Sequence, residues 1–305
     1  MDATANVSFQ QKIVAATRLS RWREHVPFTI PLSLVGSLLA IQATGAEVDW
    51  RAFAVIAANI FSMSFAFVIN NIADAPDDAL DPQKMRRNVI SNGVMSSREG
   101  WFLAALTAAC ALLLYALSGV WALAIGGVTL VLCFLYSAHP FRLKARPVTD
   151  VLSHALMLSG LLMMTGYFAY DTDPQVAWLV ILAAILFSAY GQFYNQIDDY
   201  ELDKSAGLQN TVVLLGKPLT RLLSFASLLG ALACMAVSIQ YGLFPPWLGT
   251  FLIIGFLIVL MFPWEFDMRG NLATDGGNVQ RPGLIVANLV AMVWLASAMG
   301  VLSIG

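Results

Sequence analysis

The chain has 305 residues, of which 58% are hydrophobic and only 12% are charged. A soluble domain carries about 25% charged residues, so this composition argues against a soluble enzyme and for a bundle of membrane helices. The net charge of −2 at pH 7 gives no sign of nucleic-acid binding, and the three cysteines lie in apolar runs without the CxxC spacing of a zinc site.

Nine stretches approach the roughly 20 apolar residues that a membrane-spanning helix needs. We therefore predict an all-α fold, a polytopic membrane bundle of nine transmembrane helices that forms one domain over residues 1–305. The predicted spans are Val26–Thr44, Phe53–Asn70, Trp101–Leu117, Val120–Ser137, Val151–Tyr170, Val176–Gln196, Leu219–Tyr241, Trp247–Trp264 and Gly283–Ile304.

The basic residues are distributed unevenly between the two sets of connections. Of the 17 Lys and Arg residues, all except Arg51 fall on one side of the predicted membrane. The positive-inside rule makes that side cytoplasmic, so we expect a multi-pass protein of the cell inner membrane with a cytoplasmic N-terminus. The longest cytosolic loops should cover about residues 71–100 and 197–218.

The pattern N-x-x-x-D-x-x-x-D closes the second predicted span and recurs at the end of the sixth. The two triads are Asn70, Asp74 and Asp78, and Asn195, Asp199 and Asp203. Residues four apart on a helix differ by about 40° of rotation, so each triad should form one stripe. The recurrence predicts two pseudo-repeated halves around a central cavity, with the stripes facing each other at the cytoplasmic edge.

Placing one Asp within the membrane costs roughly 2.5–3.5 kcal/mol, so a cluster of acidic groups at a membrane edge indicates a functional site. The two clusters contain Asp74, Asp77, Asp78, Asp81, Asp198, Asp199, Glu201 and Asp203. Mg²⁺ prefers oxygen ligands and commonly bridges carboxylates to substrate phosphates. The clusters therefore predict a Mg²⁺ site that receives a diphosphate, in preference to two solvated helix ends. Pro76 is expected to loosen the helix at the first cluster.

These motifs resemble those of the UbiA-type superfamily of intramembrane prenyltransferases. The chain is similar to the family's two acidic motifs and to its Tyr- and Lys-containing segment at Asn70, Asp74 and Asp78, at Asp199 and Asp203, and over residues 136–144. The resemblance implies a Mg²⁺-dependent transfer of a prenyl group from a polyprenyl diphosphate to a hydrophobic or aromatic acceptor within the lipid bilayer.

The resemblance also implies roles for particular residues. Asp74 and Asp78 would hold one Mg²⁺, and Asp199 and Asp203 would hold another, as the catalytic residues. The expected substrate-binding residues are Asn70, Asn71, Arg86, Tyr136, Arg142, Lys144, Asn195 and Asp198. Asn71 departs from the family pattern, which has Asp there; an amide oxygen still coordinates a metal but adds no charge.

Several readings stay open at this stage. A terpene cyclase on the same scaffold would use the same acidic clusters, and a transporter would also explain repeated halves with membrane carboxylates. Transport is less favoured because the acids gather at one membrane face. The acceptor is equally open between an aromatic quinone precursor, a glycerol-phosphate-type lipid, a chlorophyllide and a carotenoid.

Overall fold

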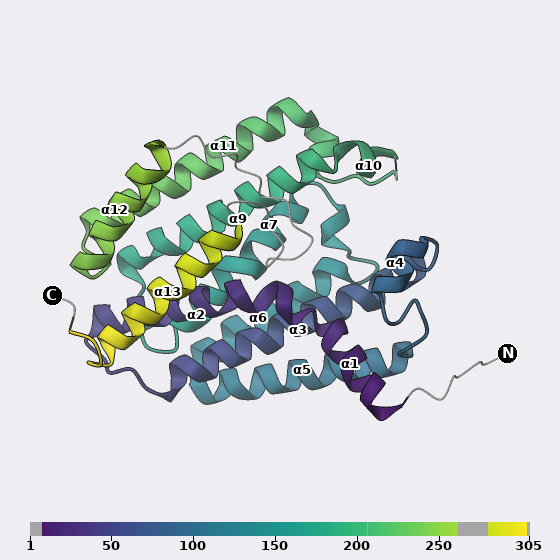
Figure 1. Cartoon of the computed structure of the whole chain (residues 1–305), viewed down its shortest axis with the longest axis horizontal. Helices are drawn as coiled ribbons and strands as arrows, with labels where there is room; N and C mark the ends of the chain where they lie inside the picture. Colours follow the sequence, from purple (N-terminus) through teal and green to yellow (C-terminus); the bar gives the residue numbers. More distant parts are fainter. Residues whose placement is uncertain (1–7, 206, 262–279, 304–305) are drawn as a thin grey trace.

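The computed structural model describes residues 8–205, 207–261 and 280–303, and within these ranges the regular structure is helical. Its elements are α1 (Phe9–Ser20), α2 (Trp22–Thr44), α3 (Trp50–Asp78), α4 (Pro82–Arg87), α5 (Ser97–Ser118), α6 (Val120–Ser137), η1 (Leu143–Ala145), α7 (Thr149–Ala155), η2 (Leu156–Gly160), α8 (Leu161–Tyr167), η3 (Gln175–Ala177), α9 (Trp178–Asp198), α10 (Tyr200–Ser205), α11 (Thr211–Gln240), α12 (Pro246–Met261) and α13 (Gln280–Ala298). The short helices α4 and α10 lie at the same end of the bundle, on the right of Figure 1.

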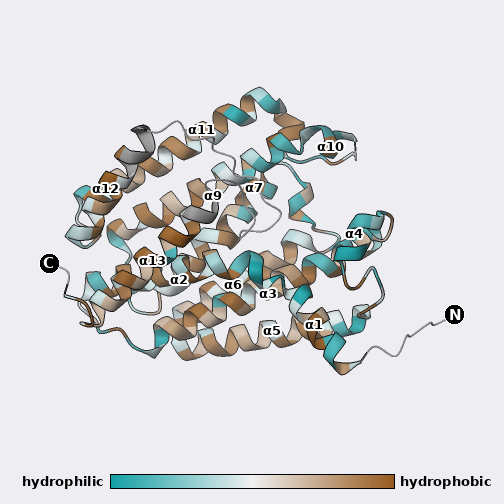
Figure 2. Cartoon of the chain, in the orientation of Figure 1, coloured by the Kyte–Doolittle hydropathy of each residue, from teal (hydrophilic) through white to brown (hydrophobic). Residues whose placement is uncertain are grey.

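Among the described residues, six segments are long and apolar enough to cross a membrane: α2, α3, α5, α6, η3 with α9, and α11. Hydrophobic residues line the long helices, whereas polar residues gather around α4 and α10 (Figure 2). The prediction of an all-helical, multi-pass membrane protein is confirmed at this level.

The other three predicted spans have less regular counterparts. Val151–Tyr170 covers the consecutive segments α7, η2 and α8, in which η2 is a π-helix. α12 and α13 supply only shorter apolar stretches among the described residues. The predicted ends of the last two spans, Trp264 and Ile304, lie outside those residues. The count of nine spans therefore stays a prediction.

The two acidic triads sit on different local structures. α3 begins at the Asp49 cap and remains helical through Pro76 to Asp78, so the expected loosening before Asp78 is wrong. Proline lacks the N–H donor and its ring crowds the carbonyl four residues earlier, but only two residues of α3 follow Pro76, so few helical hydrogen bonds are affected. α9 ends at Asp198 and α10 begins at Tyr200, so the second triad is not on one uninterrupted helix.

Glycine allows α2 and α8 to pack with their backbones in contact. A Cβ atom on Gly36 would lie 2.1 Å from the carbonyl oxygen of Met163, and one on Gly166 would lie 2.2 Å from that of Ser33. Small residues at such crossings are typical of membrane helix pairs, where close van der Waals packing supplies much of the association energy.

A buried polar group, Asn59 of α3, ties four helices together. Its amide nitrogen donates to Ser33 Oγ at 2.7 Å and to Thr165 Oγ1 at 2.9 Å, and its oxygen accepts from Tyr115 Oη at 2.5 Å. All four side chains are buried. Satisfying every polar atom in this way is what makes such a group tolerable in an apolar core. The network fixes how α2, α5 and α8 surround α3.

Candidate functional site

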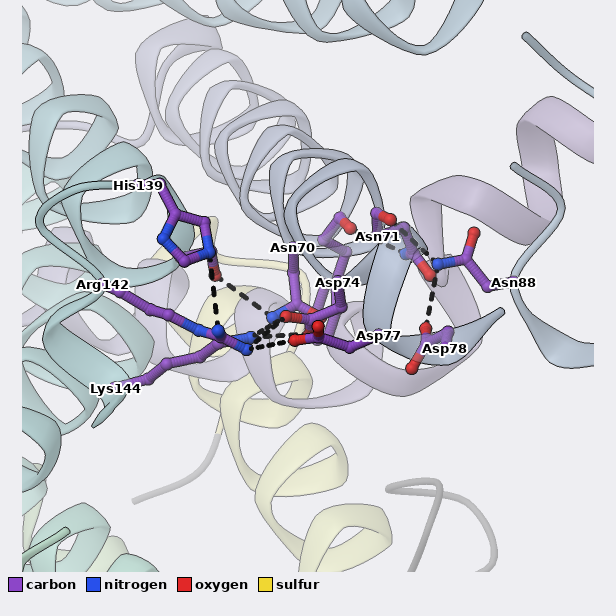
Figure 3. Close-up of polar contacts among 11 residues, drawn as sticks. Asn70, Asn71, Asp74, Asp77, Asp78, Asn88, His139, Arg142 and Lys144 are labelled. Atoms are coloured by element: carbon purple, nitrogen blue, oxygen red, sulfur yellow. Dashed lines mark hydrogen bonds and ion pairs between the residues drawn. The ribbon is translucent and has the colours of Figure 1, made fainter. Parts of the chain in front are cut away.

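Asp74, in the last turns of α3, is held by two cations from the α6–α7 connection (Figure 3). Lys144 Nζ lies 2.7 Å and 2.6 Å from its two carboxylate oxygens. Arg142 Nη2 lies 3.3 Å from Asp74 Oδ1 and 3.1 Å from Asp77 Oδ2. Arg142 and Lys144, which the sequence suggests as diphosphate contacts, thus lie beside the first acidic cluster and pair with its carboxylates.

The connection that carries these cations has an unusual backbone. Arg142 adopts a left-handed conformation (φ 39°, ψ 58°) before the short helix η1, which contains Lys144. Burial lowers the pKa of Lys144 from its ordinary value, and the nearby Asp74 carboxylate acts in the opposite direction. Arg142 Nε is buried and has no hydrogen-bond partner within the described part of the chain. This site therefore retains an unused donor for an anionic ligand.

The other side of the first cluster is organised by amides. Asn88 Nδ2 donates to Asp78 Oδ2 at 2.9 Å and to the backbone oxygen of Asn71 at 2.8 Å. Asn71 Nδ2 donates to the backbone oxygens of Phe67 at 2.7 Å and Leu19 at 3.3 Å. Asn71 thus joins the end of α1 to α3, a role that requires an amide donor and that a carboxylate cannot fill.

A cavity of about 1040 Å³ opens beside Asp74 and Asp78, between α1, α2, α3 and α4. It is strongly cationic. The basic residues on its wall are Arg18, Arg21, Arg23, Lys84, Arg86 and Arg87. These six cations outnumber the three carboxylates on the same wall, Glu24, Asp74 and Asp78, and the excess favours binding of a polyanion such as a diphosphate.

The remaining predicted substrate residues of the first half lie close to this region. Arg86 lines the cavity, and its Nε donates to the Pro82 oxygen at 3.0 Å. Asn70 also lines the cavity and donates to Ser137 Oγ at 3.1 Å. Tyr136, next to Ser137, is half-buried, with its ring 6.4 Å from that of His154.

The second cluster forms at the junction of α9 and α10. Asn195 and Asp198 are exposed near the end of α9, and Asp199 follows as its cap. Asp203 lies on α10 and accepts a hydrogen bond of 2.6 Å from Asn210 Nδ2.

The charges of this cluster act on one another. Burial raises the pKa of Asp199 above the ordinary 3.8, and the charges of Asp203 and Asp198 raise it further. Burial also raises the pKa of Asp203, against the opposing effects of the Asn210 hydrogen bond and of Lys84. Lys84 belongs to α4, which lies at the same end of the bundle as α10 (Figure 1).

The donor set suits a hard cation, although the clusters are not closed around one. Among the described residues, no three acidic, His or Cys side chains converge at metal-binding distance. Asp74 is already paired with Lys144 and Arg142, whereas Asp199 carries repulsion that a divalent cation would relieve. Carboxylate oxygens of this kind are the ligands that Mg²⁺ prefers.

Sequence reasoning missed several contributors to the site. Arg87 and Asn88 come after Arg86 in a segment that resembles the family's sequence after the first acidic motif, but that likeness gave neither residue a role. Arg18 and Arg23 could be read from sequence as charges that set membrane topology. They lie on the cavity wall because α1 packs against α3. The hydrogen bond from Asn71 Nδ2 to the Leu19 oxygen holds the two helices together.

Comparison with known proteins gives a consistent family assignment. The model of the UbiA prenyltransferase family matches residues 29–269. A 4-hydroxybenzoate octaprenyltransferase of Pseudomonas syringae pv. tomato is 29% identical over 250 residues, which cover 79% of each chain. A lycopene elongase/hydratase of Haloferax volcanii is 27% identical over 250 residues, covering 79% of this chain and 78% of that protein.

The fold has solved counterparts as well. A UbiA homologue from Archaeoglobus fulgidus, bound to GPP and Mg²⁺, superposes with a TM-score of 0.73 at 21% identity and covers 94% of this chain and 99% of its own. A homologue from Aeropyrum pernix K1, in its apo form, superposes with a TM-score of 0.65 at 23% identity, covering 90% and 97% of the two chains.

Proposed function

Because the chain belongs to the UbiA prenyltransferase family, we propose that it transfers a prenyl group from a polyprenyl diphosphate to a hydrophobic or aromatic acceptor in a Mg²⁺-dependent reaction within the membrane. The observation that supports this proposal is the position of both acidic clusters at the same polar end of an apolar bundle, with a cationic cavity beside the first cluster.

The cationic wall binds and orients the diphosphate. Arg18, Arg21 and Arg86 offer charge from the cavity side, while Arg142 offers its unpartnered Nε from the other side of Asp74. As the allylic C–O bond breaks, negative charge grows on the departing diphosphate, and donors already fixed in position stabilise that charge without reorganisation. Prepositioned cations are therefore the chain's own contribution to the bond-breaking step.

Asp74 and Asp78 from α3, together with Asp199 and Asp203, are the groups that would hold Mg²⁺. The metal supplies Lewis-acid neutralisation of the diphosphate. The fit rests on the all-oxygen donor set and on the mutual repulsion within the second cluster. On this proposal Lys144 holds the Asp74 carboxylate in position before the substrate arrives.

The asparagines and the remaining polar residues bind the substrate. Asn70 faces the cavity from α3, and Asn195 and Asp198 stand at the corresponding end of α9. Tyr136, near the end of α6, offers an aromatic face that suits a prenyl cation. Two related halves that share a central cavity, nine spans and one domain over residues 1–305 complete the proposed architecture.

The topology follows from the same arrangement. With the cationic end of the bundle at the inner leaflet, the N-terminus lies on the cytoplasmic side of the inner membrane. The diphosphate then enters from the cytosol, and its apolar tail extends between the helices. The relatives leave the acceptor class open between an aromatic acid and a carotenoid-like hydrocarbon.

Product analysis tests the proposal directly. Purified protein would be incubated with Mg²⁺, prenyl diphosphates of several lengths and a pooled set of aromatic, lipid and carotenoid acceptors, and products would be identified by mass spectrometry. A prenylated acceptor that forms only with Mg²⁺ is the expected result. Release of a cyclic hydrocarbon without any acceptor would mean a cyclase, and movement of unchanged substrate across a vesicle membrane would mean a transporter.

A further inference from the structure

Asp150, at the start of α7, is fully buried, and its carboxylate accepts hydrogen bonds from separate parts of the chain. Its Oδ2 atom lies 2.7 Å from Gln196 Nε2 and 2.7 Å from the backbone nitrogen of Thr211. Its Oδ1 atom accepts from the Thr211 hydroxyl and from the backbone nitrogen of Val151 at 2.8 Å. Asp150, Gln196 and Thr211 together are called the Asp150 hub below. A carboxylate buried this deeply is tolerated because its lone pairs are used.

The Asp150 hub contacts the chain on both sides of the segment that carries Asp198, Asp199 and Asp203. Gln196 stands two residues before Asp198, near the end of α9. Thr211 directly follows Asn210, whose side chain donates to Asp203 at 2.6 Å. The stretch that carries the second cluster therefore begins and ends on the same buried carboxylate.

The hub also holds the base of the loop that reaches the first cluster. Val148 has φ 70° and ψ −50°, and the backbone nitrogen of Thr149 donates to the Pro147 oxygen at 2.8 Å. A β-branched residue in such a γ-turn is strained and persists only where its surroundings enforce it. The enforcing contact is a 2.7 Å hydrogen bond from the Val148 nitrogen to Thr211 Oγ1.

Lys144 lies four residues before this turn and is tied to it locally. Thr149 Oγ1 donates to the Leu143 oxygen at 3.1 Å, so η1 rests on the same turn. From η1, Lys144 reaches Asp74 at 2.6 Å. A continuous series of contacts thus runs from the first acidic cluster, through Lys144's loop and the Asp150 hub, to Asp203.

We propose that Asp150 is a positioning residue that sets the separation and orientation of the two acidic clusters, without contacting metal or substrate. The inference rests on the proposed function, since it assigns the hub to the diphosphate–Mg²⁺ site. Groups that orient metal ligands from outside typically alter metal affinity or activity by about 10–100-fold when they are removed. The hub should therefore control Mg²⁺ use more than it controls overall stability.

The sharpest test compares Thr211→Val with Thr211→Ser. Valine keeps the shape of threonine and the backbone donor to Asp150 but removes the hydroxyl that links Asp150 to Val148. We expect Thr211→Val to raise the half-saturating Mg²⁺ concentration about 10-fold, and Thr211→Ser to remain near the wild type. Asp150→Asn should raise the half-saturating Mg²⁺ concentration at least as much as Thr211→Val does. The amide nitrogen of the new asparagine is a donor, and it would lie against groups that now donate to the carboxylate.

Hydrogen–deuterium exchange gives a readout that needs no turnover. In Thr211→Val, peptides that cover residues 143–150 and 198–205 should exchange faster than in the wild type, while residues 80–88 should not change. Mn²⁺ binding followed by electron paramagnetic resonance should weaken in parallel. Unchanged exchange at residues 198–205 would overturn the proposal.

Asn59→Leu is the matched control, because Asn59 is an equally buried and fully bonded polar residue in the middle of α3. It should lower the melting temperature without changing the half-saturating Mg²⁺ concentration. If Thr211→Val and Asp150→Asn behave as Asn59→Leu does, the hub is only structural and the proposal is wrong. If the wild type transfers no prenyl group at all, the proposed function fails, whereas exchange and Mn²⁺ binding still decide the role of the hub.

Discussion

Lys144 and Asp74 form a two-point ion pair, with Nζ at 2.7 Å and 2.6 Å from the two carboxylate oxygens. Only 18% of the Lys144 side chain and 21% of the Asp74 side chain is exposed, so the pair is shielded from bulk water. A shielded pair of this kind constrains both partners, and removal of either one leaves the other charge partly buried without its partner. The predictions below follow from this pair and from its surroundings.

Replacing Lys144 should impair catalysis strongly. Lys144→Met keeps the length of the side chain but removes its charge, so Asp74 loses its orientation and the site loses a fixed cation. We expect kcat to fall by about 100-fold or more, the usual cost of removing one preorganised donor. Arg146→Met is the control from the same loop, because the Arg146 side chain donates to the Pro140 oxygen and has no carboxylate partner among the described residues. Its kcat should stay within about twofold of the wild type; equal losses in both variants would contradict this role for Lys144.

Asp74 and Asp77 provide a matched pair that separates the proposed metal ligand from a surface carboxylate. Asp77 is 64% exposed and pairs with Arg142, whereas Asp74 is shielded. Asp74→Ala should reduce turnover by at least about 100-fold, roughly 3 kcal/mol of transition-state stabilisation, and Asp77→Ala should have a small effect. Asp199→Ala should match Asp74→Ala.

Size-exclusion profiles and melting temperatures would confirm that all three variants fold. Substantial turnover by folded Asp74→Ala or Asp199→Ala would count against the assignment of these residues to the metal site.

Asn71 should resist conversion to the aspartate typical of the family. Its amide donates to the backbone oxygens of Phe67 and Leu19, and a carboxylate would instead place negative charge against them. We expect Asn71→Asp to lower the free energy of unfolding by about 1–3 kcal/mol, and Asn71→Ala to lower it less because no repulsion is added. Thermal melting at neutral pH measures both. A more stable Asn71→Asp protein would show that the α1–α3 contact does not depend on the amide.

The second cluster should make both stability and Mg²⁺ binding depend on pH. The pKa of Asp199 is raised above the ordinary 3.8 by burial and by Asp203 and Asp198. Folding therefore favours the protonated carboxyl: this contribution to stability is complete below 3.8 and is lost as pH rises through the raised pKa. Without divalent cations, the melting temperature should fall over that interval.

Protons compete with the metal for the same oxygens, so the half-saturating Mg²⁺ concentration should rise as pH falls through the raised pKa. Asp198→Asn removes one repulsive charge and should move this profile to lower pH. Glu47→Gln, an exposed change in the α2–α3 connection, should leave the profile in place. An unshifted profile in Asp198→Asn would contradict the electrostatic explanation.

The sequence was sufficient for the elements whose signal is local. Long apolar runs determined where α2, α3, α5, α6, α9 and α11 would lie, because hydrocarbon thickness and backbone hydrogen bonding leave few alternatives. The spacing of Asn70, Asp74 and Asp78 on one helix was equally readable. The break between α9 and α10 was not, since the run from Asn195 to Asp203 contains no proline or glycine.

Contacts between distant residues could not be predicted. The direct pairing of Lys144 with Asp74 depends on the fold of the α6–α7 connection, whose left-handed Arg142 has no sequence signature. The cationic cavity depends on the return of α1 along α3, which is decided by backbone acceptors and by the Asn71 amide. The role of Asp150 could not be predicted, because Gln196 and Thr211 become its neighbours only after the chain folds.

The π-helical segment η2, Leu156–Gly160, connects two helices that serve different partners. Before it in the chain, α7 places Asp150 against the end of α9 and the start of α11. After it, α8 packs against α2 through Gly166. Each residue on a helix advances the side-chain direction by about 100°, so this segment acts as a rotational offset between the two partners. Deletion of Leu158 would restore a regular helix and turn Asp150 away from Thr211 while α8 keeps its packing. If the Leu158 deletion left hydrogen–deuterium exchange at Val148 as in the wild type, the rotational offset at η2 would not be what orients α7.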